Sequence, residues 1–331
     1  MPRPKPQDCG MTTLTLSNGT PVARFAYGTM QWGGTADAAA SQEMFEHCRS
    51  AGITHFDTAA GYTGGASEQL LGRFAKVCRD DIFVATKVGY VGGASPENIH
   101  KQFDVSRQRL DMECIDLLYL HRFDDDTPLE QTFEAMANLQ AKGHIRAIGV
   151  SNYAAWQVMK AQAVCARLGT KIDAIQPMYN LVKRQAEVEI FPMAVDQGMA
   201  IVPYSPLGGG LLTGKYNTGQ GGRLRDDDRY AARYAPRNMH EAAKQLSKLA
   251  ADNGIHPATL AVAWVARNET APHPIISARS VAQLQPSLDA MSFDLSHALY
   301  TQVSALFAAP PPATDRLEAI SYTHLTLPTK A

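Results

Sequence analysis

Eight short apolar segments, separated by helix-like segments, are the feature that most restricts how this chain can fold. We expect β-strands at 24–30, 55–58, 82–87, 116–121, 145–150, 174–178, 200–204 and 274–277. Strands that alternate with helices along a chain are typical of parallel sheets, and eight such units close a barrel. The sequence therefore predicts the α/β class and, within it, a (β/α)8 TIM barrel.

Helical patterns fill the intervals between these strands. Apolar residues recur every three or four positions, as in Leu129, Phe133 and Met136, which is the period of an amphipathic helix. We expect helices at 38–51, 66–78, 97–111, 129–142, 154–168, 185–197, 239–268 (as two helices), 280–290 and 295–307.

The chain has 331 residues, of which 45% are apolar, enough for one barrel with a large core. We expect this single barrel to span 11–308. Asn18-Gly19 predicts the turn of an N-terminal β-hairpin at 14–22, and the Gly-, Arg- and Asp-rich residues 206–238 predict a long loop after the seventh strand. Residues 1–10 are expected to be disordered. Residues 309–331 form a Pro-rich tail, and its last part, 321–331, resembles a translated adapter rather than native sequence.

Composition excludes several classes of partner. A net charge of -1 gives no sign of binding to nucleic acid or to an anionic membrane, and no apolar run approaches membrane-spanning length. The five cysteines are widely spaced and form no CxxC motif, so we expect reduced thiols and a cytoplasmic protein. The sequence does not indicate an oligomeric state.

Four polar side chains close or follow the second, third and fourth strands: Asp57, Tyr62, Lys87 and His121. Active sites of TIM barrels lie at the carboxyl ends of the strands, so we expect these residues to converge. A nearby ammonium lowers the pKa of a phenol, and Lys87 would in this way make Tyr62 a proton donor. Asp57 would keep Lys87 charged, and His121 would orient a carbonyl group.

Other interpretations of the same residues stay open. Asp57 could form a turn or a helix cap, while Tyr62 and His121 could pack in the core. A lysine that ends an apolar strand is costly unless it is paired, but Lys87 also fits the Schiff-base lysine of a barrel aldolase. No HxH or HExxH motif is present, so we expect no metal site.

A Gly-rich segment at 209–215 matches the pattern GxxxxGK, but Tyr216 stands where a P-loop requires Ser or Thr. Its backbone N–H groups and Lys215 are still suited to a pyrophosphate, and Arg223 could cover that group. Arg279 opens a helix after the eighth strand, where TIM barrels often bind phosphate, and its planar side chain suits a 2′-phosphate. No GxGxxG motif follows a strand, which excludes a Rossmann-type cofactor site.

With these residues in view, the sequence resembles the aldo-keto reductase family from about residue 14 to 307, most closely the aflatoxin-aldehyde reductase and bacterial general reductase branches. The family's tetrad falls on Asp57, Tyr62, Lys87 and His121. The stretches 149–152 (Gly-Val-Ser-Asn), 176–179 (Gln-Pro-Met-Tyr) and 204–215 also agree with the family.

The resemblance implies a reductase of aldehydes or ketones that uses NADP(H), with a small-molecule carbonyl as its partner. Asp57 and the residues of several loops would hold the cofactor: Gly28, Thr29 and Met30 at the ribose; Ser151, Asn152 and Gln176 at the carboxamide; Tyr204 on the nicotinamide; Ser205, Pro206, Leu207, Gly209, Leu211, Gly214, Lys215 and Arg223 at the pyrophosphate; Ser277, Ala278, Arg279 and Gln283 at the adenosine end.

The chain departs from the family pattern at two places. Ser277 replaces a frequent Gly, and Gln285-Pro286-Ser287 replaces residues that resemble Glu-Glu-Asn. For the substrate pocket we expect Trp32, Tyr90 and Phe123, whose rings could instead pack in the core. A cofactor-binding sensor with little turnover, like the potassium-channel β subunits of the same fold, remains an alternative function.

Overall fold

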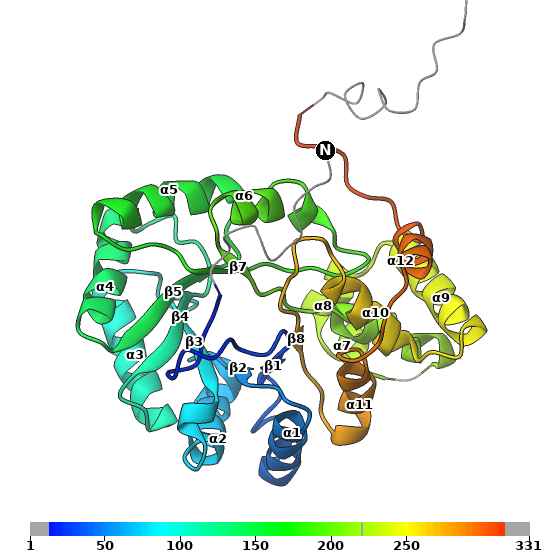
Figure 1. The fold of residues 1–331 in the computed structure, drawn as a ribbon, viewed down its shortest axis with the longest axis horizontal. Coiled ribbons are helices and arrows are strands. Elements are labelled where there is room, and N and C mark those ends of the chain that lie inside the picture. Colours follow the sequence, from blue (N-terminus) through cyan, green and yellow to red (C-terminus); the bar gives the residue numbers. More distant parts are fainter. Residues whose placement is uncertain (1–12, 220, 315–331) are drawn as a thin grey trace, which may run out of the picture.

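The computed structural model describes residues 13–219 and 221–314, and the strands in these residues form one parallel eight-stranded sheet (Figure 1). The strands are β1 (Ala26–Gly28), β2 (His55–Asp57), β3 (Phe83–Val88), β4 (Ile115–Leu120), β5 (Ile145–Ser151), β6 (Ala174–Gln176), β7 (Ala200–Ile201) and β8 (Ile275–Ile276). Their spatial order follows the chain from β1 to β7, with β8 on the other side of β1. The backbone N–H groups of His273 and Ile275 donate to the carbonyls of Ile201 (2.8 Å) and Pro203 (2.9 Å), which joins β8 to β7. The predicted (β/α)8 TIM barrel is confirmed.

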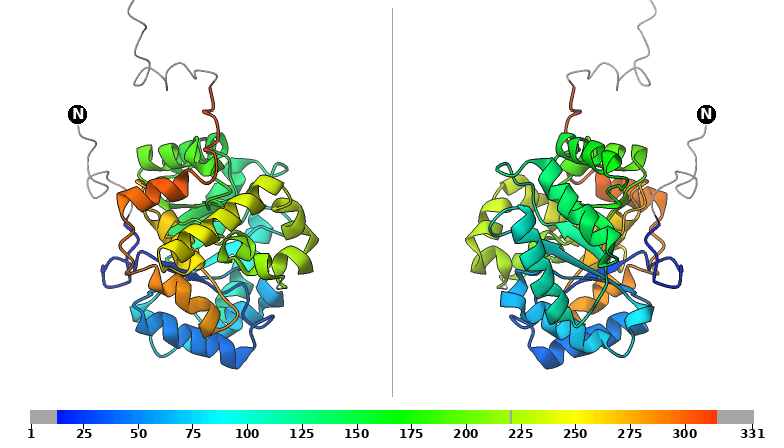
Figure 2. Two further views of the ribbon diagram at one scale, coloured as in Figure 1. Left: turned by 90° about the vertical axis from the view of Figure 1, so that its right-hand side faces the viewer. Right: turned by 90° about the vertical axis from the view of Figure 1, so that its left-hand side faces the viewer.

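Helices surround the strands, as the three views together show (Figures 1 and 2). They are α1 (Ala38–Ser50), α2 (Ala66–Ala75), α3 (Pro96–Leu110), α4 (Leu129–Ala141), α5 (Ala155–Arg167), α6 (Ile190–Asp196), α7 (Arg223–Asp226), α8 (Asp228–Arg233), α9 (Arg237–Asp252), α10 (Pro257–Ala266), α11 (Val281–Asp289) and α12 (His297–Ser304). The predicted helical segment 239–268 is indeed two helices, α9 and α10. The expected long loop 206–238 contains short helical pieces: two 3-10 segments (Gly208–Thr213 and Lys215–Thr218), α7 and α8.

The predicted N-terminal hairpin closes one end of the barrel. Gly19 has the positive φ of +85° that its tight turn requires, and the N–H of Leu16 donates to the carbonyl of Thr20 at 2.8 Å. Leu14 and Leu16 are buried in the same apolar cluster as the barrel-lining residues, such as Phe83 at the start of β3. The hairpin therefore covers the amino-terminal ends of the strands and leaves the carboxyl-terminal ends for the site.

A second and larger apolar cluster fills the layer between the strands and the helices. Every residue of α10 except Pro257 is buried, which explains why this helix is almost entirely apolar rather than apolar along one face. Among the described residues, no helix combines the length and the apolar character that crossing a membrane requires. The expectations for residues 1–10 and 321–331 lie outside the described residues.

Candidate active site

The four predicted catalytic side chains meet at the carboxyl ends of neighbouring strands. Asp57 ends β2, Lys87 is the penultimate residue of β3, and His121 directly follows β4. Tyr62 begins the 3-10 segment Tyr62–Gly65 after β2. The Lys87 Nζ donates to Asp57 Oδ1 at 2.5 Å and lies 3.4 Å from the hydroxyl of Tyr62. A carboxylate, an ammonium and a phenol are thus in contact in one cluster.

The ion pair between Lys87 and Asp57 is buried, with 0% and 3% of the respective side chains exposed. Burial acts to lower the pKa of Lys87, but Asp57 and Tyr62 outweigh it, and the pKa lies above the usual value. Burial raises the pKa of Asp57, and the contacts with Lys87 and Gln176 oppose that rise. Because the lysine also donates to the carbonyl of Thr58 at 2.7 Å, its charge is matched by two acceptors. Lys87 is therefore held as an ammonium.

The pKa of Tyr62 differs from the sequence-based expectation. Burial is the largest influence and raises the pKa of Tyr62 above its usual value; the ammonium of Lys87 opposes this rise without cancelling it. The sequence-based prediction that the pKa of Tyr62 is lowered is therefore right for the contribution of Lys87 alone, whereas the net shift of this pKa is upward. A raised pKa keeps the phenol protonated at neutral pH, which is the state that a proton donor needs.

His121 faces Tyr62 across the same site. The two ring centroids are 5.9 Å apart with the planes nearly perpendicular, and the ring of Tyr90 lies 4.9 Å from that of His121 on another side. Burial, together with the positive charges of Lys87 and Arg122, lowers the pKa of His121 to about 3. The imidazole is therefore neutral at neutral pH and has one N–H to donate.

Gln176 connects the tetrad to the next strands of the barrel. Its Nε2 donates to Asp57 Oδ2 at 2.8 Å, so that both oxygens of this carboxylate accept a hydrogen bond. The hydroxyl of Ser151, at the end of β5, donates to the carbonyl of Gln176 at 2.9 Å. The carboxylate of Asp57 is thereby fixed in orientation beneath Lys87.

Asn152 extends this network to the rim of the barrel. It adopts a positive φ of +57°, a conformation that asparagine tolerates better than most residues. Its side-chain amide donates to the carbonyl of His121 at 2.9 Å and accepts from the hydroxyl of Tyr204 at 2.7 Å. Tyr204 thus presents its ring at the rim, beside the tetrad.

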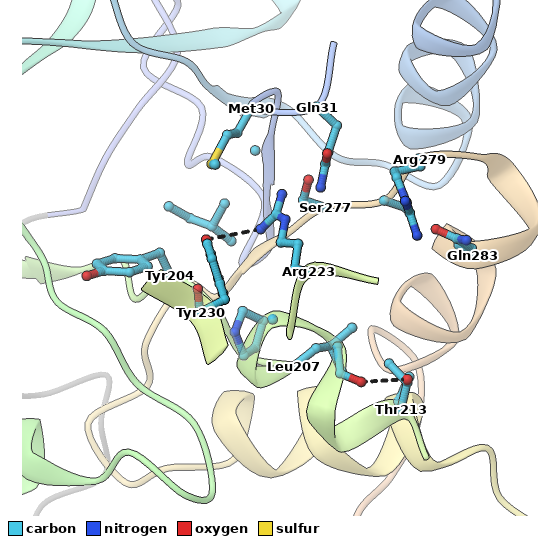
Figure 3. Close-up of a pocket in the computed structure, with 18 of the residues that line it drawn as sticks. Met30, Gln31, Tyr204, Leu207, Thr213, Arg223, Tyr230, Ser277, Arg279 and Gln283 are labelled. Carbon is cyan, nitrogen blue, oxygen red and sulfur yellow. Dashed lines mark hydrogen bonds between the residues drawn. The ribbon is translucent and has the colours of Figure 1, made fainter. Parts of the chain in front are cut away.

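A cavity of about 1200 Å³ begins at the tetrad and runs toward the loops after β7, β8 and β1 (Figure 3). Its far part is cationic, because Lys215, Arg223 and Arg279 all line it. Burial, followed by the positive charges of Arg279 and Arg223, lowers the pKa of Lys215. Like charges held this close repel one another, and an anion between them would relieve that repulsion.

The Gly-rich segment forms the wall of this cationic part. Gly209 and Gly210 have φ values of +66° and +95°, which residues with a side chain rarely adopt. A Cβ on Gly209 would also lie 2.8 Å from the ring of Tyr230. Because these two residues have no side chain, their backbone can border the cavity directly. Arg223 reaches over this wall, and its guanidinium donates to the hydroxyl of Tyr230 at 3.2 Å (Figure 3).

Comparison with known proteins identifies the family. A sequence model of the aldo/keto reductase family matches residues 24–307. The chain belongs to the aldo-keto reductase family. It is 32% identical over 287 residues to the fission-yeast (Schizosaccharomyces pombe) aldo-keto reductase yakc [NADP(+)], covering 82% of this chain and 83% of that protein. It is 31% identical over 294 residues to a probable voltage-gated potassium channel subunit beta of Arabidopsis thaliana, covering 83% of this chain and 89% of the relative. Human aflatoxin B1 aldehyde reductase member 2 is 38% identical over 197 residues, 57% of this chain and 54% of that protein.

Most of the residues predicted for the site line the cavity of this aldo-keto reductase. They are Gly28, Met30, Asp57, Tyr62, Tyr90, His121, Ser151, Asn152, Gln176, Tyr204, Ser205, Pro206, Leu207, Gly209, Gly214, Lys215, Arg223, Ser277, Ala278, Arg279 and Gln283. The lining does not include Thr29, Trp32, Lys87, Phe123 or Leu211. Lys87 lies behind Tyr62, in contact with its hydroxyl.

The other four residues are placed by packing rather than by the cavity. Thr29 is buried and bonds to Ser67 (2.6 Å), and Leu211 is 2% exposed in the core. Trp32 is 0% exposed and packs against the rings of Tyr27, Phe45 and Phe74. Phe123 packs against Tyr153 and Trp156. Of the three aromatic residues expected at the substrate, only Tyr90 lies at the cavity.

Several lining residues of this aldo-keto reductase were not predicted from the sequence: Gln31, Gly61, Thr63, Arg122, Arg229, Tyr230, Arg233, Ser247, His256, Pro257, Ala258, Ile275, Ala282 and Pro286. Gly210 and Thr213 also line the cavity and lie within the predicted Gly-rich segment 209–215. Arg122 had a usable signal, because it directly follows His121 at a strand end. Tyr230 and Arg233 had none, because they lie in α8 within a segment that reads as an irregular loop.

Proposed function

We propose that this protein reduces aldehydes or ketones to alcohols with NADPH, and that Tyr62 is the proton donor. One observation carries the proposal: the hydroxyl of Tyr62 lies 3.4 Å from the buried ammonium of Lys87, at the cavity wall and facing the ring of His121. A phenol in this position can protonate a carbonyl oxygen as negative charge develops on it.

The cavity fits a phosphorylated dinucleotide. Lys215, Arg223 and the glycine backbone suit a pyrophosphate, and Arg279 suits a 2′-phosphate through its planar fork. Nearer the tetrad, Ser151, Asn152 and Gln176 offer polar groups to a carboxamide, and Tyr204 offers an aromatic face. When bound, NADPH supplies the hydride. The name of the fission-yeast relative, which includes NADP(+), supports the choice of cofactor.

Each residue of the tetrad has a different role in the protonation of the carbonyl oxygen. The neutral imidazole of His121 donates a hydrogen bond that orients it. Tyr62 then transfers its hydroxyl proton to the same oxygen, because an alkoxide is a far stronger base than a phenolate. The adjacent Lys87 stabilises the phenolate that remains, and Asp57 keeps that lysine charged and in place.

Two alternatives remain distinguishable from this function. A Schiff-base aldolase needs a neutral lysine, whereas the ion pair with Asp57 raises the pKa of Lys87 and favours the ammonium. A cofactor-binding sensor with little turnover is supported by the name of the Arabidopsis relative, a probable potassium channel subunit beta.

The test of the function is a panel of aldehydes and ketones with NADPH and, in parallel, NADH. We expect NADPH to be consumed with formation of one alcohol per cofactor, and faster turnover with NADPH than with NADH at equal subsaturating concentrations. Tight NADPH binding without consumption across the panel would instead support the sensor. An adduct trapped by borohydride, with no loss of NADPH, would support the aldolase.

The cavity also predicts a preference among carbonyl substrates. Arg122, which directly follows His121, and Arg233, whose charge acts on Tyr204, both line the cavity. Their guanidinium carbons lie 5.2 and 5.1 Å from the ring centroids of Tyr90 and Tyr230. Neither forms an ion pair with another residue in 13–219 or 221–314, although hydrogen bonds and, less strongly, the charge of Arg122 lower the pKa of the nearby Asp124. A carboxylate on the substrate could therefore pair with either guanidinium. We expect kcat/KM for para-carboxybenzaldehyde to exceed that for its methyl ester by about 10-fold or more, the value of one charged hydrogen bond.

Arginine variants test this preference. In Arg122→Met and Arg233→Met the ratio of the two kcat/KM values should fall toward one. Arg229→Met is a matched control, because Arg229 also lines the cavity but pairs with Asp227 at 2.9 Å. Its ratio should change least of the three, and an equal fall in all three would contradict the assignment to Arg122 and Arg233.

A further inference from the structure

A side chain outside the cavity holds the turn that carries Tyr62. Arg109 lies near the end of α3, and its Nη1 donates to the carbonyl of Ala60 at 2.9 Å. Ala60 is two residues before Tyr62 in the connection from β2. The N–H of the same residue donates to the carbonyl of Lys87 at 3.1 Å. Ala60 is therefore fixed on one side by the strand that carries the lysine and on the other by Arg109.

The connection that follows Ala60 depends on outside support. Thr63, Gly64 and Gly65 all have positive φ, at +49°, +66° and +98°. Thr63 is unusual among these because it is branched at Cβ and pays a steric cost in this conformation. A segment in such a conformation keeps it only where its surroundings fix it, and Tyr62 lies immediately before it.

The two helices are packed so that Arg109 reaches this turn. Gly72 of α2 lies against α3 so closely that a Cβ would be 2.4 Å from the carbonyl oxygen of Leu110. A Cβ on Gly65 would lie 2.3 Å from the guanidinium carbon of Arg109. The guanidinium therefore sits directly on the backbone of the turn, in space that a larger residue at position 65 would occupy.

Glu68 connects Arg109 to the strand of Lys87. Its side chain is 0% exposed, and its Oε2 lies 3.4 Å from Arg109 Nη1. Its other oxygen, Oε1, accepts from the hydroxyl of Thr86 at 2.7 Å, and Thr86 precedes Lys87 on β3. One buried carboxylate thus ties the side chain that holds the tyrosine turn to the strand that presents the ammonium.

We propose that Arg109 and Glu68 are positioning residues that set the separation of the Tyr62 hydroxyl from the Lys87 ammonium. The inference rests on the proposed function, since that separation matters for proton transfer. A purely structural ion pair is the competing explanation, but the Arg109 side chain is 27% exposed, and ion pairs, whether exposed or buried, often add little to stability. The arrangement of the contacts, on both sides of the Tyr62–Lys87 contact, is what a positioning role requires.

The test compares wild type with Arg109→Met and Glu68→Gln, using Arg107→Met as control. Arg107 lies on the same helix and pairs with the exposed Glu113 at 2.6 Å, so the control removes an equal charge away from the turn. A displacement of about 1 Å at reacting groups lowers rates by up to about 100-fold. We expect kcat for carbonyl reduction to fall about 10- to 100-fold in both variants, with the KM for NADPH nearly unchanged and the control close to wild type.

Two further measurements separate positioning from simple loss of stability. Oxidation of an alcohol with NADP+ requires the Tyr62 phenolate, so the pH at which its kcat rises should move upward in Arg109→Met, because the ammonium stabilises the phenolate less. The NMR resonance of Tyr62 Cζ in tyrosine-labelled protein, assigned with Tyr62→Phe, should shift in Arg109→Met and Glu68→Gln but not in Arg107→Met.

The outcomes are distinct. A lower Tm with wild-type kcat, pH profile and Tyr62 resonance would overturn the positioning role. If Arg109→Met does not fold, Thr86→Val, which keeps the shape of the side chain and removes the link to Glu68, should still lower kcat and shift the resonance; an unchanged Thr86→Val would also overturn it. If the Tyr62 resonance shifts in the variants but the wild-type protein reduces no carbonyl compound, the proposed function is contradicted. The positioning of Tyr62 would still be supported.

Discussion

Replacement of Tyr62 by phenylalanine is expected to lower kcat for carbonyl reduction by about 10²- to 10⁴-fold, the range that a positioned proton donor contributes. The change removes one oxygen and keeps the ring that faces His121. Affinity for NADPH should change little, because the change leaves the cationic residues Lys215 and Arg279 in place. The measurement is kcat and KM for a reactive aldehyde, together with the dissociation constant of NADPH.

Tyr90→Phe is the matched control for this prediction. Tyr90 also lines the cavity, and its ring lies 4.9 Å from that of His121, closer than the ring of Tyr62. Within 13–219 and 221–314 it makes no hydrogen bond to Lys87, and its charged neighbour is Arg122, whose guanidinium carbon lies 5.2 Å from the ring centroid. The hydroxyl of Tyr90 therefore lacks the buried ammonium that the hydroxyl of Tyr62 contacts. We expect Tyr90→Phe to retain kcat within about 10-fold. Similar losses in the two variants, or turnover by Tyr62→Phe near that of wild type, would remove Tyr62 from the proposed role.

The fold was predictable because most of its strand residues are buried, the main exception being Arg146 in β5. In β3 and β4 every residue is buried, so an apolar run in the sequence corresponds directly to a strand of the barrel. Prediction was weakest in the segment 206–238, whose short helices α7 and α8 are too brief to show a clear period. Their place over the cavity depends on contacts such as that of Arg223 with Tyr230, which no local pattern encodes.

The candidate site also contains residues that the sequence predicted and residues that it did not. Asp57 and Lys87 were recognisable because charged residues interrupt apolar strands only where they are paired. Trp32 was expected at the substrate, yet it is fully buried, because a ring after β1 can turn toward either the cavity or the helix layer and the sequence does not distinguish these directions. Arg109 could not be found at all. It reads as a surface arginine of a helix, and its main acceptor is a backbone carbonyl that has no signature in sequence.

Replacement of Lys87 by methionine has the second large effect, on both stability and catalysis. The change leaves the carboxylate of Asp57 buried without its ammonium, and loss of one partner of a buried pair costs about 3–5 kcal/mol of the free energy of unfolding. It also removes the charge that opposes the rise in the pKa of Tyr62. A weaker acid and a less stable phenolate should together lower kcat for reduction by at least about 100-fold.

A double variant separates the two effects. Lys87→Met combined with Asp57→Asn removes both charges, so we expect most of the lost free energy of unfolding to return, as measured by urea denaturation. The kcat should not return, because the phenol still lacks its cationic neighbour. If kcat recovers together with stability, the low activity of Lys87→Met reflects misfolding, and the ammonium has no part in proton transfer. If neither variant reduces carbonyls and wild type alone is trapped by borohydride with a carbonyl compound, Lys87 is a Schiff-base nucleophile rather than the neighbour of an acid.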